Sequence, residues 1–311
     1  MNTIRLTGLR GETLLGFLAA LGTLRVLVET IFEAKLAWSE CGGGWVAELN
    51  VPEGTLRDAD HVAEVVFAAL DQRKANHPIL QWERFLGKAF TDESDFFRAS
   101  ATAVLSTASG SNEDFAPLFS TQISVRQGDT LEHFDHPFRA ARKDYYIGNL
   151  KSVLANTQLS HVRRTIVFPW DYQDAMANQS LRLDHGDDRR HAYQWHAPTE
   201  DPARQKVGCM LGANRLALEA FPLFPCLPRG DGGTAIGFNC KSKTYTWVSW
   251  PIWTAPCSLL LISSLLNLEI VQDTEPSPKS LRKMGIAAVL RSRRLPVEKN
   301  KVFLPPVSIA S

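Results

Sequence analysis

A long helical pattern interrupted by two glycines puts the strongest constraint on how this chain folds. Residues 12–36 read ETLLGFLAALGTLRVLVETIFEAKL, and their large apolar side chains recur on one stripe of a helix. Gly16 and Gly22 lie inside this pattern, where a glycine costs about 1 kcal/mol relative to alanine. Small residues inside a helix are typical of close approach by a neighbouring backbone. We therefore expect this helix to pack tightly against another part of the protein, with close approach of a ligand as the alternative.

The remaining patterns predict an α+β fold of mixed helices and small antiparallel sheets, because strands and helices do not alternate regularly. Short strands are expected at residues 3–9, after the GGG turn at 42–44, and within 117–129, and a hairpin is expected at 234–250. Helices are expected at about 56–75, 79–90, 92–106, 138–157, 212–221 and 255–268. A length of 311 residues allows two units. We predict an N-terminal α+β domain over residues 1–130 and a C-terminal α+β domain with a basic tail over 131–311.

Composition and cysteine spacing narrow the class of protein. An apolar fraction of 44% and a charged fraction of 22% are ordinary for a globular chain. The five cysteines are scattered without a C-x-x-C pair, which argues against a disulfide framework and a structural zinc site. No run of about 18 apolar residues is present, and the N-terminus lacks the basic-then-apolar order of a secretory signal. These features indicate a cytoplasmic protein without a membrane segment.

The stretch SLRLDHGDDRRHAYQWH, residues 180–196, supports two different hypotheses. Its acidic and imidazole side chains, together with EHFDH at 132–136, could supply ligands for a divalent metal in phosphodiester hydrolysis. No H-E-x-x-H or comparable spacing is present. The competing interpretation takes Arg189 and Arg190 as the important members, held by neighbouring carboxylates while they offer a planar fork to a phosphate or a partner carboxylate. The candidate ligands are Asp184, His185, Asp187, Asp188, His191, His196, Glu132, His133, Asp135 and His136.

Positive charge is concentrated in two segments of a chain whose net charge is only +1. Residues 139–164 carry six cations and one acid, Asp144, and residues 279–301 carry eight cations and one acid, Glu298. Such segregation is one mark of a nucleic-acid-binding surface, and a solvated surface is the alternative. The predicted nucleic-acid-binding residues are Arg139, Arg142, Lys143, Lys151, Arg163, Arg164, Arg282, Lys283, Arg291, Arg293 and Arg294. Without neighbouring aromatic residues in the sequence, we expect Arg291, Arg293 and Arg294 to contact phosphate rather than bases.

Several strings resemble one family. The segments DYYIGNLKSVLANT and FPWDYQDAMANQSLRLDHGDDRRHAYQWHAPTEDPARQKVGCMLGANRLALEAFPLFP are similar to proteins of CRISPR type I-G (formerly I-U) loci, the helicase-nuclease-extension family and its large-subunit-like relatives. The opening LTGLRGETLLGFLAALGTLRVL is similar to the N-terminus of the type I-G large subunit. The resemblance covers the first forty residues and roughly 140–226. The family often has proline where this chain has His185, which argues against a metal role for that histidine.

The resemblance implies a non-enzymatic subunit of an RNA-guided antiviral effector complex. In such complexes base pairing between guide and target gives sequence specificity, while protein subunits hold the nucleic-acid backbone. The implied partners are the other effector subunits, guide RNA, target DNA and the helicase-nuclease, and no cofactor, metal or catalytic residue is implied. A metal-dependent nuclease using the Asp184–His196 cluster and a structural adaptor that binds no nucleic acid remain open. The residues predicted to serve structure or subunit interfaces are Asp184, Asp188, Arg189, Arg190, Asn214 and Arg215.

Overall fold

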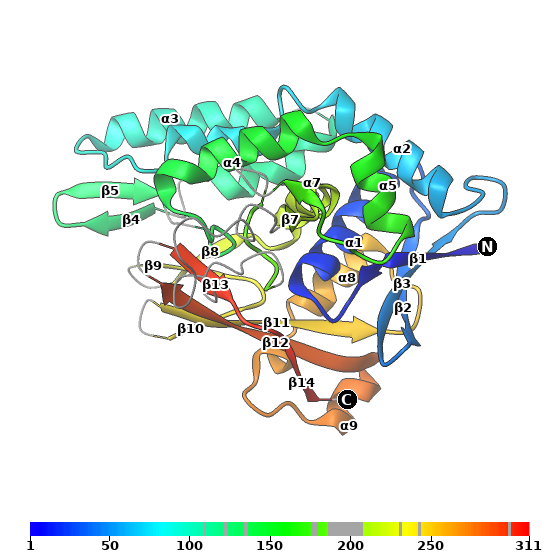
Figure 1. Ribbon diagram of the computed structural model, residues 1–311. Helices are drawn as coiled ribbons and strands as arrows, with labels where there is room; N and C mark the ends of the chain where they lie inside the picture. The colour runs from blue at the N-terminus through cyan, green and yellow to red at the C-terminus, as the bar shows by residue number, and fades with distance from the viewer. Residues whose placement is uncertain are drawn as a thin grey trace, which may run out of the picture.

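The chain has an α+β fold in which helices cover small antiparallel sheets (Figure 1). The computed structural model describes residues 1–108, 110–120, 124–133, 136–175, 180–185, 208–229, 232–241, 244–297 and 300–310. Among these residues no helix combines the length and the apolar character needed to cross a membrane.

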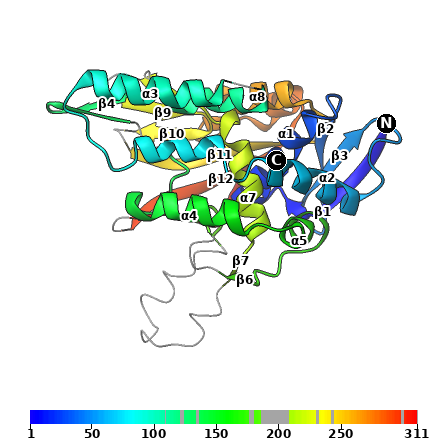
Figure 2. The same ribbon diagram turned by 90° about the horizontal axis from the view of Figure 1, so that it is seen from above.

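The N-terminal sheet has three antiparallel strands in the order β1-β3-β2. Its strands are β1 (Asn2–Arg10), β2 (Lys35–Cys41) and β3 (Gly44–Val51). Between β1 and β2 the chain forms α1 (Leu14–Val28), which begins where the Thr13 side chain accepts a hydrogen bond from the backbone N–H of Gly16. The predicted strands at residues 3–9 and after the GGG turn therefore lie in one sheet. Figure 2 shows this sheet at the opposite end of the molecule from β4 and β9.

The second sheet is formed by the C-terminal part of the chain and has the order β10-β11-β12-β13, with β14 also paired to β12. The predicted hairpin is confirmed, because β10 pairs with β11 in antiparallel register. The basic segment that the sequence places in a tail forms the middle strand β12, which pairs with three others. The strands are β10 (Phe238–Lys241), β11 (Thr244–Trp253), β12 (Ile286–Val297), β13 (Asn300–Phe303) and β14 (Val307–Ala310).

Helices and small hairpins surround these sheets. The helical elements are α2 (Ala59–Gln72), η1 (Pro78–Arg84), α3 (Glu93–Thr107), η2 (Gly110–Phe119), α4 (Lys143–Asn156), α5 (Leu159–Val167), α7 (Leu211–Ala220), η5 (Phe221–Leu223), α8 (Leu259–Leu266), η6 (Glu269–Gln272) and α9 (Pro278–Lys283). The short strand pairs are β4 (Ser124–Gln127) with β5 (Thr130–His133), β6 (Asp174–Ala175) with β7 (Gly208–Cys209), and β8 (Cys226–Arg229) with β9 (Gly232–Ala235).

Several predicted elements differ from the structure. The helix read over residues 12–36 ends at Val28, and Lys35 and Leu36 already belong to strand β2. The helix expected at 79–90 is the short 3₁₀ helix η1, although Trp82 and Phe85 are buried as its apolar pattern predicts. The strand expected within 117–129 begins only at Ser124, because the preceding residues around Pro117 continue the 3₁₀ helix η2. Proline lacks the N–H that a strand would need for pairing on that side.

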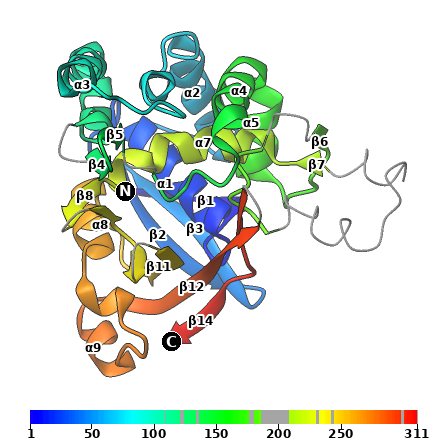
Figure 3. The ribbon, with the colours of Figure 1, turned by 90° about the vertical axis from the view of Figure 1, so that its left-hand side faces the viewer.

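The two glycines of α1 lie where backbone approaches closely, as the sequence predicts. A Cβ at Gly22 would lie 1.9 Å from the carbonyl oxygen of Leu216 in α7, and one at Gly16 would lie 2.2 Å from that of Arg10. Helix α7 lies between α1 and the outer helices, and all ten of its residues are buried (Figure 3). Apolar residues from both sides of residue 130 belong to one core cluster. A division into two domains at that position stays a prediction.

A buried carboxylate joins the helices at this contact. One oxygen of Glu219 accepts hydrogen bonds from Arg215 at 2.7 Å and from His77 at 3.0 Å, and the other accepts from Arg25 at 2.8 Å. Burial alone would raise the pKa of the Glu219 carboxyl, but Arg215, His77 and Arg73 around it hold that pKa well below its usual range. The carboxylate therefore stays ionised and links α1, α7 and the residue that caps η1.

The α1–α7 contact gives a stability prediction. Replacing Gly22 by alanine should lower the free energy of unfolding by about 1–3 kcal/mol, because the methyl group would overlap the Leu216 backbone and force the helices apart. Gly148→Ala in α4 is the matched control, because a Cβ there meets no atom within 4 Å. It should stabilise the protein by up to about 1 kcal/mol. Urea denaturation followed by circular dichroism measures both, and equal effects would contradict the prediction.

The Glu219 contacts give a second prediction. Glu219→Gln should lower the free energy of unfolding by about 3–5 kcal/mol at neutral pH. The reason is that Arg25, His77 and Arg215 lose the buried negative charge to which they bond. Because the pKa of Glu219 is depressed, its stabilisation is present above the unfolded pKa of about 4.5 and is lost as the pH falls through the folded value. Glu53→Gln, at a carboxylate that is 84% exposed, should change the unfolding free energy by less than about 0.5 kcal/mol. A loss at Glu219 no larger than this control would contradict the prediction.

Candidate nucleic-acid interface

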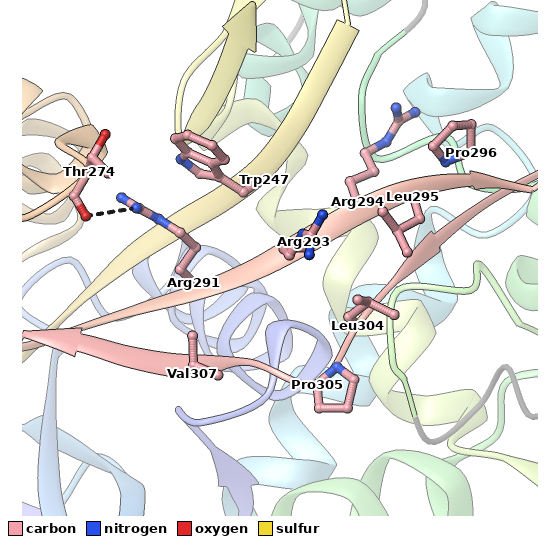
Figure 4. A pocket seen from close by; sticks show the side chains of 10 residues that line it. All are labelled: Trp247, Thr274, Arg291, Arg293, Arg294, Leu295, Pro296, Leu304, Pro305 and Val307. Atoms are coloured by element: carbon pink, nitrogen blue, oxygen red, sulfur yellow. Dashed lines mark hydrogen bonds between the residues drawn. The ribbon is translucent and has the colours of Figure 1, made fainter.

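A groove of about 690 Å³ lies along the C-terminal basic segment, on the face of the second sheet (Figure 4). Strands β11 and β12 form its floor, and the connection from β13 to β14 forms one wall. Three of the predicted nucleic-acid-binding arginines line it. The lining residues are Trp247, Thr274, Arg291, Arg293, Arg294, Leu295, Pro296, Leu304, Pro305 and Val307.

Strand alternation explains which side chains share the groove face. In β11, Val248, Trp250 and Ile252 are fully buried. Side chains of directly paired residues share a face of the sheet, and Trp247 pairs with Arg293. The β11 residues that alternate with the buried ones, such as Trp247 and Ser249, therefore lie on the opposite face. Their partners in β12, Arg293 and Arg291, lie on that same face. The sequence could not show this because the register between β11 and β12 is a long-range property.

Arg291 is held rigidly at the floor of the groove. Its guanidinium donates hydrogen bonds to the Ser249 hydroxyl at 2.8 Å and to the carbonyls of Asp273 at 2.6 Å and Thr274 at 3.3 Å. The same guanidinium lies over the ring of Trp247, 4.8 Å from its centroid. Burial lowers the pKa of Arg291, and Asp273 opposes this effect. An arginine stays protonated across the physiological range, so the groove has a fixed positive charge.

The other cations of the segment have different environments. Arg293 is exposed on the groove face, whereas Arg294 is buried and donates to the carbonyl of Pro137 at 3.0 Å. Arg282 and Lys283 lie exposed in the last turn of α9, directly before β12. Arg291 and Arg294 therefore stabilise the fold as well as line the groove. Arg293 and the α9 cations are the ones placed to reach a ligand in solution.

The first basic segment is largely neutralised by acids from other parts of the chain. Lys143 pairs with Glu132 at 3.2 Å, Lys151 pairs with Glu83 at 2.8 Å, and Arg163 pairs with Asp60. Arg164 pairs with Asp174 at 2.7 Å and also with Asp171. Arg139 is buried and donates to the carbonyl of Ala141, and Arg142 lies over the ring of Tyr145. The excess counted along the sequence is therefore much smaller in space, and a nucleic-acid role for this segment stays a prediction.

Two of the proposed metal ligands lie among aromatic rings. His133 is buried 4.4 Å from the ring of Phe85, and His136 is stacked on Phe221 at 5.3 Å. The Nε2–H of His136 donates to the carbonyl of Phe224 at 2.9 Å, while its Nδ1 accepts from the N–H of Phe138 at 3.2 Å. Burial lowers the pKa of His136 to about 4. The ring is thus neutral and fully hydrogen-bonded, as expected of a core residue.

The second proposed cluster lies mostly outside the described residues. Asp184 is buried and accepts a hydrogen bond from the Tyr172 hydroxyl at 3.0 Å, and Nδ1 of the exposed His185 lies 3.4 Å from the same carboxylate. Across the ranges given above, no three His, Cys, Asp or Glu side chains come together as metal ligands would. The members that fall outside those ranges are Asp187, Asp188, Arg189, Arg190, His191 and His196, and Asp135 falls outside as well.

Asn214 and Arg215 are buried in α7 and bond within the chain. The side-chain oxygen of Asn214 accepts from the N–H of Leu181 at 2.8 Å, and its amide donates to the carbonyl of Met210 at 2.9 Å. Arg215 donates to Glu219, as described above. Both residues therefore hold α7 in place. Asn214 also fixes Leu181, in the chain that leads into the Asp184 stretch.

Trp247 is the aromatic lining residue that sequence reasoning missed, because the arginines of the groove lie far from it along the chain. The alternation of Val248, Trp250 and Ile252, which are buried on one face of β11, places Trp247 on the other face of the strand. This alternation is the sequence pattern that could have indicated Trp247. No protein-family model matches the chain, and no curated protein matches it either.

The buried histidines predict a pH dependence. Burial lowers the pKa of both His77 and His136 to about 4 from 6.5, so between these values the unfolded chain binds the additional protons. Stability should therefore fall as the pH is lowered from about 6.5 to 4, by about 1.4 kcal/mol per pH unit for each histidine. In His136→Phe the slope should be smaller by about one histidine's share, as measured by urea denaturation across this range. Parallel curves for the variant and the parent would contradict the prediction.

Proposed function

We propose that this protein is a nucleic-acid-binding subunit that holds phosphates along the groove face of the second sheet. One observation carries the proposal: Arg293 is exposed beside a guanidinium, that of Arg291, which is already fixed by three hydrogen bonds. An anion that binds there meets a preorganised positive site, so little side-chain entropy is lost on binding. Lys279 and Lys283, exposed on α9 just before β12, extend the positive surface along the chain.

The biological setting that we propose is a CRISPR type I-G effector complex in the cytoplasm. The support is the resemblance of the α1 and α7 strings, which the structure brings into direct contact at Gly22 and Leu216. The partners would be the other effector subunits, guide RNA or target DNA, and the helicase-nuclease. Specificity would come from base pairing, so this subunit needs a surface for the backbone and no reaction centre.

A metal-dependent nuclease that uses the Asp184–His196 cluster is the alternative function, and Asp184, buried at the edge of this stretch, would be one of its ligands. A buried carboxylate needs a partner, and here the Tyr172 hydroxyl supplies one at 3.0 Å. The two functions differ in their products. Incubation of the protein with labelled DNA and RNA in Mg²⁺ or Mn²⁺ separates them, because only the nuclease gives shorter fragments.

The phosphate-binding proposal predicts a change in salt dependence. Replacing Lys279, Lys283 and Arg293 by glutamine should weaken binding similarly for every sequence. It should also flatten the slope of log affinity against log salt by about two to three units, because each phosphate that the protein neutralises contributes about 0.7–0.9 to that slope. Fluorescence anisotropy with a labelled oligonucleotide across a salt series measures the slope. These three positions avoid Arg291 and Arg294, whose bonds to backbone carbonyls stabilise the fold.

A control variant removes three positive charges from positions outside the groove. Arg57, Lys74 and Lys88 are exposed and lie outside the groove lining. Their replacement by glutamine should leave the slope within about 0.5 of the parent value, since the same phosphates stay neutralised. Equal slopes for the two triple variants would mean that the groove face meets solvent or another protein. The structural-adaptor function would then replace the proposal.

A further inference from the structure

We infer that the groove beside Trp247 takes one unstacked nucleobase, so that the protein binds single-stranded nucleic acid in preference to a duplex. This inference rests on the proposed function, which concerns phosphates alone, and it adds a site for the base. The sequence predicts no base contact, because the aromatic residue comes from a strand about forty residues away from the arginines. The structure brings Trp247 directly opposite Arg293.

Trp247 is held in a fixed orientation in the groove. Trp247 is partly exposed, and the Arg291 guanidinium lies 4.8 Å from its ring centroid. Three hydrogen bonds fix that guanidinium to Ser249, Asp273 and Thr274. The tryptophan is thus held against a rigid planar cation and loses little freedom when a ligand packs on it. Aromatic and arginine planes of this kind are what single-strand-binding proteins offer to bases.

Apolar side chains form the wall of the groove across from the tryptophan. Leu295 of β12, Leu304 and Pro305 after β13, and Val307 of β14 all line the groove (Figure 4). Val307 is 58% exposed, so its apolar surface is accessible to a ligand in the groove. A site that bound phosphate alone would gain nothing from these residues. The flat face of a base is apolar, so an apolar wall and an aromatic ring suit it well.

Positive charge lies next to this apolar space. Arg293 is exposed between Trp247 and Leu295 on the same face of the sheet. A nucleotide in the groove would therefore place its base against the apolar lining while its phosphate contacts Arg293. The lining contains no carboxylate and no side-chain amide among the residues named for it. Recognition would depend on stacking, which every base offers, and would tolerate many sequences.

A duplex cannot use both parts of this groove. In a double helix both faces of each base are covered by neighbouring bases, and only the base edges are accessible in the grooves. A duplex could place its phosphates on Arg293 but could not fill the space between Trp247 and the Leu304–Pro305 wall. Single-stranded or locally opened nucleic acid is the ligand that uses both parts of the groove.

Binding of three labelled probes to the full chain tests the inference. The probes are an oligodeoxythymidine, the same strand annealed to oligodeoxyadenosine, and an abasic strand with the same number of phosphates. Fluorescence anisotropy should show that the parent protein binds the single strand about 5- to 150-fold more tightly than the abasic strand, the range expected for stacking of a base on an aromatic side chain. Trp247→Ala should remove most of this difference, and Trp247→Phe should retain it.

The outcomes distinguish the inference from the proposed function. If all three probes bind with salt-dependent affinity and the base makes no difference, the groove holds phosphates only; the inference is then wrong and the proposed function stands. If none of the probes binds, the proposed function fails and the inference fails with it. The abasic comparison uses the unaltered protein, so it decides the question even if Trp247→Ala does not fold. Arg98→Ala, on α3, is the charge control and should leave all three affinities unchanged.

Discussion

The ionised carboxylate of Glu219 is the interaction on which the rest of the structure depends. It is fully buried, and it would be costly in the core without the hydrogen bonds from Arg215, Arg25 and His77. Those partners come from α7, from α1 and from the residue that caps η1. Each of these elements is therefore fixed relative to the same two oxygen atoms. The close contact of Gly22 with Leu216 can form only when the helices have this orientation.

The fold class and several elements could be predicted from the sequence, because they depend on local periodicity. The α1 pattern, the hairpin at 234–250 and the close backbone contact at the helix glycines are examples. The role of the second basic segment was harder to predict. Read along the chain, Arg291, Arg293 and Arg294 form a charged run, but strand pairing turns them to different sides of a sheet. Pairing of β12 with three other strands is a long-range property that no local pattern encodes.

The candidate site was still harder to predict from the sequence than the strand pairing. Its cations could be found by counting charge, whereas its aromatic and apolar members could not, because β11, β12 and β14 supply them from separate stretches. Counting charge along the sequence also overestimated the net positive charge that the segment 139–164 presents in the folded protein. The carboxylates that pair with Lys143, Lys151 and Arg163 lie at sequence separations of 11, 68 and 103 residues. A cation run along a chain therefore indicates a binding surface only where folding brings no acid beside it.

The burial of α1 affects how the protein is made. Fourteen of its fifteen residues are inaccessible in the folded chain, and Arg25 meets Glu219 across a separation of 194 residues. At a synthesis rate of about 5–20 residues per second, α1 leaves the ribosome roughly 10–40 s before its partner helix exists. During that interval its apolar surface has no native contact, which is the condition under which nascent chains aggregate or engage chaperones. The same packing that makes the finished core tight therefore leaves the emerging α1 without its native partner until α7 has been made.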